Sequence, residues 1–140
     1  MPRVNYVHRQ NIYWYDTVFV EDHKVYRMFG AERVGNLLLT NIDGNIGQTG
    51  SDESLVILGL EGYILTGAQE AIRNFGAQIT IGDMPQGPII PLGKLWDLRL
   101  KIPQRQRWEV DVQPIVSKFN PSPIRLLLNV IRSNHVGMDA

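Results

Sequence analysis

Apolar and polar residues alternate with a period of two in several short segments of the chain. In residues 95–102, leucine and isoleucine alternate with Arg99 and Lys101, and after Pro103 the alternation resumes over residues 107–113. Successive side chains of a β-strand point to opposite faces, so this pattern predicts strands that turn one face toward an apolar core. The two segments therefore predict two β-strands joined by a polar corner.

Glycine and proline divide the rest of the chain at short intervals. The 13 glycines and 8 prolines leave segments of about 6–12 residues, which is the spacing typical of an all-β sandwich or barrel. Further strands are predicted over residues 34–41, 54–66, 77–81 and 124–131, with a hairpin over residues 17–28. Only residues 67–74 have a helical pattern, and a helix this short is marginally stable in water.

The predicted strands number about eight, which fits a closed barrel or a two-sheet jelly roll. We predict an all-β, two-sheet sandwich of jelly-roll type with at most one short helix. The strand over residues 54–66 is expected to bend at Gly59 or Gly62, where a missing side chain permits a bulge. The proline-rich residues 84–91 are expected to form a loop or a sheet edge, because proline donates no ladder hydrogen bond.

The domain organisation is predicted from the polarity of the two ends. We expect an extended N-terminal arm over residues 1–15, one β-sandwich domain over residues 16–132 and a C-terminal tail over residues 133–140. The arm carries four aromatic residues: Tyr6, Tyr13, Trp14 and Tyr15. We expect these rings to lie against the chain's own sheet or against a neighbouring subunit.

Charge and composition narrow the classes of partner. The 14 lysines and arginines balance the 14 aspartates and glutamates, so the formal net charge is zero. A nucleic-acid binder usually carries a basic surplus, whereas a neutral chain associates readily with itself, so we expect protein partners. The chain has no cysteine, which excludes disulfides and thiolate catalysis. No apolar signal core or bilayer-length apolar stretch is present, so we expect a soluble protein without a membrane span.

Residue types that carry catalysis are present without the spacing that catalytic sites need. The glycine-rich loop over residues 44–50 has neither the lysine nor the following helix of a phosphate-binding loop. His8, His23 and His135 do not fall at metal-ligand spacing, and no serine lies in a nucleophile elbow. We predict no catalytic, cofactor-binding or metal-binding residue, and hence a protein that is not an enzyme.

Four cations gather around the polar corner: Arg99, Lys101, Arg105 and Arg107. Strand alternation is expected to place Arg99, Lys101 and Arg107 on one face. That face is either solvated and cross-paired with Glu109 and Asp111, or part of a protein interface, where arginine is enriched. Together with the four aromatic residues of the arm, the four cations are the predicted partner-binding residues.

The order of features in the second half of the chain is similar to that of a known group of proteins. A long apolar strand leads through GDMP (residues 82–85) to a proline-bounded strand, followed by LRLKIP, QRQRWEVDVQP and a last strand after FNPSP. This order of strands, prolines and polar corners resembles that of single jelly-roll structural proteins of bacteriophage and virus particles, including minor capsid and cementing subunits. The resemblance covers residues 55–131 and transfers no functional residues.

The resemblance implies a virion protein present in many copies in a shell. Its partners would be other copies of itself, a major capsid protein or both, with residues 1–15 reaching onto the neighbours and no small-molecule substrate. Two other functions fit the sequence. A carbohydrate-binding β-sandwich module would stack sugars on Trp14, Trp96 or Trp108. A small carboxylate-dependent enzyme would use Glu61, Glu109 and Asp111, if the fold brings two of them together.

Overall fold

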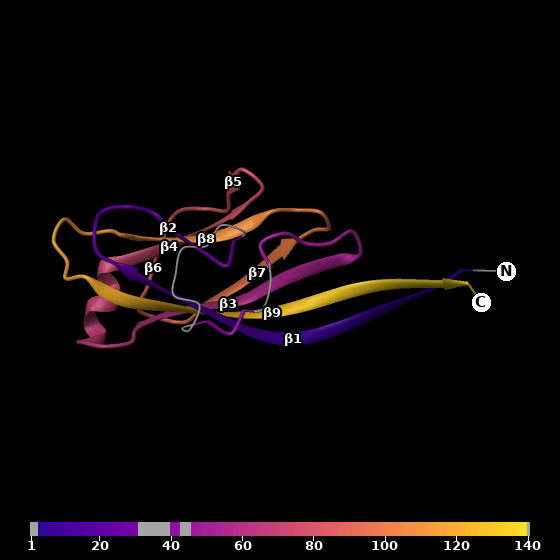
Figure 1. The fold of residues 1–140 in the computed structure, drawn as a ribbon, viewed down its shortest axis with the longest axis horizontal. Helices are drawn as coiled ribbons and strands as arrows, with labels where there is room; N and C mark the ends of the chain where they lie inside the picture. Colours follow the sequence, from indigo (N-terminus) through magenta and orange to yellow (C-terminus); the bar gives the residue numbers. More distant parts are fainter. Residues whose placement is uncertain (1–2, 31–39, 43–45, 140) are drawn as a thin grey trace.

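A computed structural model of the chain describes residues 3–30, 40–42 and 46–139. Within these residues the backbone forms nine strands and a short 3₁₀ helix, Gln69–Asn74. Sheet A consists of β1 (Arg3–Val20), β9 (Ser122–Asp139), β3 (Glu53–Ile64) and β7 (Trp96–Ile102). Sheet B consists of β2 (Tyr26–Met28), β8 (Trp108–Pro114), β4 (Phe75–Ile81) and β5 (Met84–Pro85), with β6 (Ile90–Pro91) also paired to β4. The two sheets are the layers of a sandwich (Figure 1).

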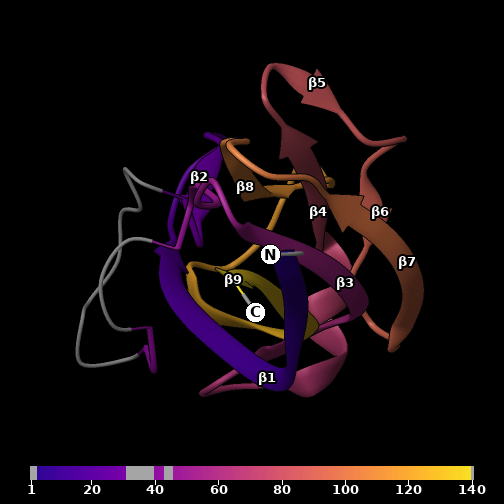
Figure 2. The ribbon, with the colours of Figure 1, turned by 90° about the vertical axis from the view of Figure 1, so that its right-hand side faces the viewer.

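The first strands of the chain pair with the last ones, and the paired strands are antiparallel. β1 pairs with β9, β2 with β8, β3 with β7 and β4 with β5. A chain that folds into one long hairpin and then rolls up has this pairing, and the orders β1-β9-β3-β7 and β2-β8-β4-β5 are those of a jelly roll. Figure 2 shows the curved strands end-on, wrapped around a common interior. The predicted all-β, two-sheet, jelly-roll-like fold is confirmed.

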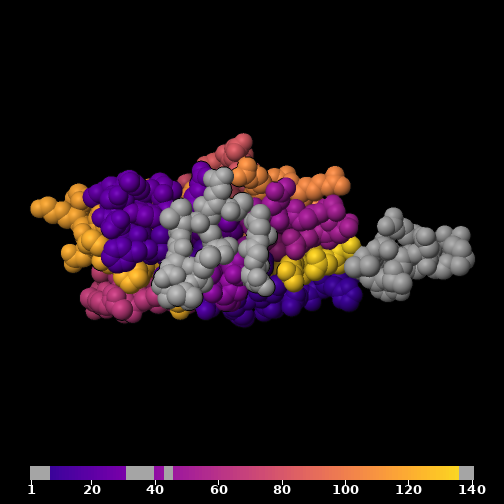
Figure 3. All heavy atoms as spheres, viewed as in Figure 1, coloured from indigo at the N-terminus to yellow at the C-terminus, as the bar shows by residue number. Residues whose placement is uncertain are grey.

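The two ends of the chain lie side by side in the longest strands. β1 and β9 pair without a register shift from Arg3↔Asp139 to Val20↔Ser122. These strands therefore run through both of the predicted domain boundaries, after residue 15 and after residue 132. Figure 3 shows β1 (indigo) and β9 (yellow) side by side along the lower part of the molecule, and Figure 1 shows both strands continuing past the body. The outermost residues of β1 and β9 show no clear alternation of apolar and polar residues in the sequence, because sheet B does not cover this part of the two strands.

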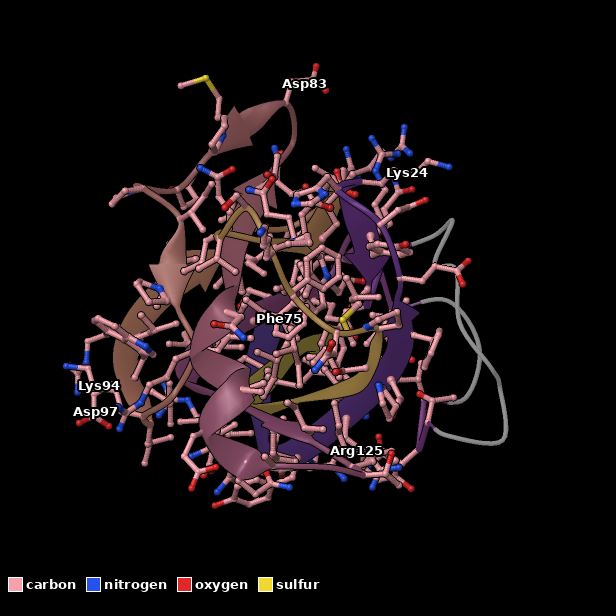
Figure 4. The ribbon with its side chains drawn as sticks, turned by 90° about the vertical axis from the view of Figure 1, so that its left-hand side faces the viewer. Lys24, Phe75, Asp83, Lys94, Asp97 and Arg125 are labelled. Carbon is pink, nitrogen blue, oxygen red and sulfur yellow. The ribbon has the colours of Figure 1, made fainter. Side chains whose placement is uncertain are left out.

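Side chains from both sheets fill the interior. Along β9, Ile124, Leu126, Leu128 and Val130 are fully buried, and the residues between them are partly exposed. Figure 4 shows Phe75 inside the sandwich and the labelled charged residues on its periphery. The alternation read from the sequence is therefore the division between an apolar core and the two outer faces.

Trp108 lies at the centre of an aromatic stack that joins the two sheets. Its ring stacks on Trp14 of β1 and on Phe29, which follows β2, with both centroid distances at 6.2 Å. All three side chains are buried, and Trp108 Nε1 donates to the Ile46 carbonyl oxygen at 2.7 Å. Each such aromatic pair contributes about 0.5–1.5 kcal/mol beyond the burial of its area. The stack thus holds β1 of sheet A against β8 of sheet B.

The predicted hairpin over residues 17–28 is wrong. β1 pairs with β9 and β2 pairs with β8, so the turn over residues 21–25 carries the chain from sheet A to sheet B. The corner over residues 103–107 does the same, because β7 pairs with β3 whereas β8 pairs with β2 and β4. Alternation identifies a strand, but it does not say whether the next strand belongs to the same sheet.

Glycine and proline account for the irregular part of β3 and for the two shortest strands. β3 shifts register between Ile57 and Gly59, which confirms the expected bend at Gly59. Residues 84–91 contain β5 and β6, each two residues long and at the edge of sheet B, as their prolines require. The strand predicted over residues 34–41 lies almost entirely outside the described residues. No helix in the described part of the chain is long and apolar enough to cross a membrane.

Gly62 leaves room for Leu92 to pack on the inner face of β3. A Cβ atom at Gly62 would lie 2.9 Å from Leu92 Cδ1 and 3.0 Å from Leu126 Cδ2, and both leucines are buried. We expect Gly62→Ala to lower the free energy of unfolding by about 1–3 kcal/mol, because the packed core must shift to admit the methyl group. Urea denaturation measures this change.

Gly59→Ala on the same strand is the matched control. A Cβ atom at Gly59 would meet its nearest neighbours at 3.7 Å, which is an ordinary van der Waals distance. Alanine also reduces the conformational freedom of the unfolded chain, so this variant is expected to be neutral or slightly stabilised. Equal losses of stability in the two variants would contradict the packing role of Gly62.

Candidate functional site

A two-stranded ribbon projects from the sandwich. β3 begins at Glu53, which pairs with Asn134, so β9 beyond this residue has β1 as its strand partner and no other in the described chain. The projecting ribbon consists of residues 3–8 of β1 and residues 134–139 of β9. Both termini lie at its tip, away from the body of the sandwich (Figure 1).

Hydrogen bonds and charges at its base tie the projecting ribbon to sheet A. Arg132 of β9 donates from Nη2 to Gln10 Oε1 on β1 at 2.9 Å, and its Nε lies 3.9 Å from Glu53 Oε2 on β3. The His135 N–H donates to the Asp52 carbonyl oxygen at 2.7 Å, just before β3 begins. These contacts join all three strands at the point where the ribbon leaves the body.

Along the body, the outer edge of β1 is covered by Thr40 and Asn41. Asn41 Nδ2 donates to the Tyr13 carbonyl oxygen at 2.7 Å, and Asn41 Oδ1 accepts from the Tyr15 N–H at 2.8 Å. Thr40 Oγ1 donates to the Tyr15 carbonyl oxygen at 2.9 Å. β1 is the terminal strand of sheet A, and in the described chain no such cover extends over residues 3–12. Among the described residues, the edge is therefore closed at the two tyrosines and open toward the N-terminus.

The outer face of sheet A carries four of the predicted partner-binding residues at its two edges. On β1, Tyr13 is 53% exposed, and Tyr15 is half-buried with the Arg125 guanidinium carbon 4.4 Å from its ring centroid. On β7, Arg99 and Lys101 are exposed. Charged residues on an edge strand hinder unwanted strand pairing, so β7 is the protected edge of this sheet.

Arg105 and Arg107 line a separate cavity of about 440 Å³. Its lining also includes Arg27 of β2, Asp83 and Glu109. Arg105 has φ at 59°, a left-handed conformation that few residues other than glycine adopt. Among these lining residues cations outnumber acids by only one, which does not favour one class of ligand.

Glu109 and Asp111 form an acidic pair on the outer face of sheet B. Arg27 Nε lies 2.8 Å from Glu109 Oε2, and Arg27 is the register partner of Asp111. Arg27 therefore occupies the position that one of the two alternatives gave to Arg99, Lys101 and Arg107, that of a cation cross-paired with these acids. Burial, followed by the negative charge of Glu109, raises the pKa of Asp111 from 3.8 to about 6, and Arg27 opposes this shift.

The predicted partner-binding residues do not form one surface. Trp14 is only 7% exposed and belongs to the core, and Tyr6 lies in the β1 segment of the projecting ribbon. Arg107 does not share a face with Arg99 and Lys101, contrary to the prediction, because β7 and β8 belong to different sheets. The open edge of β1 was not predicted, because it consists of backbone groups that every residue carries.

The three tryptophans of the sugar-stacking hypothesis do not form an exposed aromatic surface. Trp14 and Trp108 are buried in the core. Trp96 is half-buried, and Lys94 Nζ lies 4.2 Å from its ring centroid, over one face of the ring. Of the three tryptophans, only Trp96 is therefore accessible for stacking, and Lys94 lies over one face of its ring.

The three candidate carboxylates do not meet in one site. Glu61 lies on the outer face of sheet A, whereas Glu109 and Asp111 lie on the outer face of sheet B. The whole sandwich separates Glu61 from the other two. Of the three, only Glu109 and Asp111 share a face, where Glu109 is one of the causes of the raised pKa of Asp111.

His23 lies apart from the other two histidines. His23 Nε2 lies 3.1 Å from the Val116 carbonyl oxygen, and its ring meets Phe119 edge-on with centroids 4.9 Å apart. His8 and His135 are exposed at the base of the projecting ribbon. Within the described ranges, no group of three or more histidines, aspartates or glutamates could hold a metal ion.

No protein-family model and no curated protein sequence matches the chain.

Asp111→Asn is expected to change how stability depends on pH. The unfolded Asp111 titrates near its ordinary pKa of 3.8 and the folded one at about 6. Between these values the folded state binds more protons, so this carboxyl makes stability fall as pH rises from about 4 to about 6. Asparagine cannot ionise, so the stability of the variant relative to the wild type is expected to increase over that window.

Urea denaturation at several pH values measures this difference. The effect is expected to be modest, because solvent screens a half-exposed carboxylate. Gln113→Asn on the same face of β8 is the matched control, and it is expected to show no such trend because it adds and removes no ionisable group. A constant difference between Asp111→Asn and the wild type across the window would contradict the assignment.

Proposed function

We propose that the protein is a structural subunit of a viral or bacteriophage particle, such as a capsid, cement or vertex-associated protein, and that it acts through protein–protein contacts. The observation that carries this proposal is the projecting ribbon. A two-stranded ribbon on its own is marginally stable in water. In an assembly, a neighbouring subunit covers the ribbon and stabilises it.

The packed interior supports the same function. Jelly rolls occur in viral capsid proteins, in lectin domains and in cupins, so the fold does not decide among these uses. Here Phe75, Trp108 and Leu128 are among the fully or almost fully buried side chains that fill the space between the sheets. Partners would therefore meet the outer faces, the sheet edges and the projecting ribbon.

The surface chemistry is compatible with contact between copies of this chain or with a major capsid protein. The formal net charge is zero, so the copies do not repel one another strongly. Tyr13 and Arg99 are exposed on the outer face of sheet A, and tyrosine and arginine are enriched where proteins dock.

Removal of the projecting ribbon tests the proposal. A variant that spans residues 9–134 keeps the buried Trp14 and the whole ladder between β9 and β3. We expect it to unfold cooperatively, as the intact chain does, and to stay monomeric at concentrations at which the intact chain forms multimers. Sedimentation velocity measures the mass, and negative-stain electron microscopy shows whether the multimers are shell-like.

The exposed Lys24→Ala variant is the control and is expected to assemble normally. Deletion of all residues 1–15 is not a substitute, because it removes Trp14 from its stack on Trp108 and damages the core. An intact chain that stays monomeric, or a trimmed chain that assembles as well as the intact one, would contradict the proposal.

A further inference from the structure

The direction of the backbone groups along β1 follows from the hydrogen bonds at its two sides. The outward groups of Tyr13 and Tyr15 bond to Asn41, so the odd-numbered residues of β1 direct their N–H and C=O groups away from β9. On β9, the His135 N–H points to Asp52, away from β1, as the same alternation requires. The ladder has no register shift, so this parity holds along all of β1.

The open part of the β1 edge is a series of outward-directed residues with one residue at its middle. Its outward positions, from the first residue of β1 to the point where Asn41 closes the edge, are Arg3, Asn5, Val7, Arg9 and Asn11. Val7, Arg9 and Asn11 have no backbone partner on this side within the described chain. Val7 is the middle position of the series.

We propose that this open edge pairs antiparallel with the same edge of a second copy of the chain, about a two-fold axis at Val7. In this register Val7 faces Val7, Arg9 faces Asn5 and Asn11 faces Arg3. Each of these residue pairs exchanges two backbone hydrogen bonds, and sheet A becomes continuous through both subunits. The pairing rests on the proposed function, because it names the contact by which the ribbon assembles.

The position of the open stretch favours a second copy as the partner. A two-fold contact uses the same patch on both subunits, so it needs an edge that matches itself along its length. A centre at Arg9 would set the two arginines opposite each other, which is destabilising, and would also require Tyr13, which Asn41 already holds. The centre at Val7 avoids both conflicts. Val7 is 46% exposed and β-branched, which suits a residue in a new strand pair.

Single cysteines test the contact directly, because the chain has none of its own. Antiparallel residues in a hydrogen-bonded pair have Cα atoms about 5.5 Å apart, within the range of a disulfide. Val7→Cys is therefore expected to form a disulfide-linked dimer on mild oxidation. Phe19→Cys is the matched control, since Phe19 is 53% exposed, has the same parity on β1 and gains no partner in this register. Its dimer yield is expected to be several-fold lower.

Two further cysteines test the register. Asn5→Cys and Arg9→Cys face each other in the proposed dimer, but neither faces itself. A mixture of the two variants is expected to form the mixed disulfide, whereas each variant alone is expected to form little dimer. The opposite result would place the two-fold axis elsewhere and overturn the register.

Proline substitutions separate the contact between subunits from the fold. Proline has no N–H group, and the N–H of Val7 points outward, so Val7→Pro removes bonds between subunits and leaves the β1–β9 ladder intact. We expect this variant to unfold like the wild type and to lose the dimer in sedimentation velocity. His8→Pro removes an N–H that faces β9, so we expect it to destabilise the ribbon itself.

The outcomes distinguish this pairing from the proposed function. Equal cross-linking of Val7→Cys and Phe19→Cys, or a dimer that survives Val7→Pro, would overturn the pairing. If the intact chain then still assembles and the chain of residues 9–134 does not, the proposed function stands without this contact. An intact chain that is monomeric throughout overturns both. Cross-linking of Val7→Cys to an unlike protein, but not to itself, would overturn the second copy as the partner.

Discussion

The antiparallel pairing of β1 with β9 is the interaction on which the rest of the structure depends. It joins the two ends of the sequence, from Arg3↔Asp139 to Val20↔Ser122. Because β9 also pairs with β3, this ladder places the last strand in the interior of sheet A and closes the jelly roll. Bringing such distant segments together costs chain entropy, which the burial of the inward side chains of both strands offsets.

One pair of strands thus has two different roles along its length. Within the sandwich, its inward residues contribute to the core, and Trp14 meets Trp108 of the opposite sheet. Beyond Asn134, neither β3 nor sheet B accompanies the pair, and in the described part of the chain β1 and β9 have only each other as strand partners. The hydrogen bonds of Arg132 and His135 mark the change from one role to the other.

Most strands of the sandwich could be predicted from the sequence, whereas the way in which they pair could not. The segments that became β4, β7 and β8 alternate clearly, because each has one face on the core and one in solvent, whereas the segment that became β3 was recognised as a long apolar run. The ends of β1 and β9 gave no such signal, since no second sheet covers the projecting ribbon. Of the candidate site, the exposure of Tyr13, Arg99 and Lys101 agrees with a surface role. Trp14, also predicted as a partner-binding residue, lies in the core, in line with the alternative that the rings of the arm pack on the chain's own sheet.

Within the sandwich, the sequence by itself determined most of the segments that are strands and which of their side chains face the core, because side-chain direction is a local property of an extended backbone. The tertiary structure alone decided which strands are neighbours, because backbone donors and acceptors are the same in every strand and do not specify a partner. For that reason Arg99 lies in β7 of sheet A, whereas Arg107, eight positions later, directly precedes β8 of sheet B. For the same reason, the open edge of β1 became visible only when the partner on its other side was known.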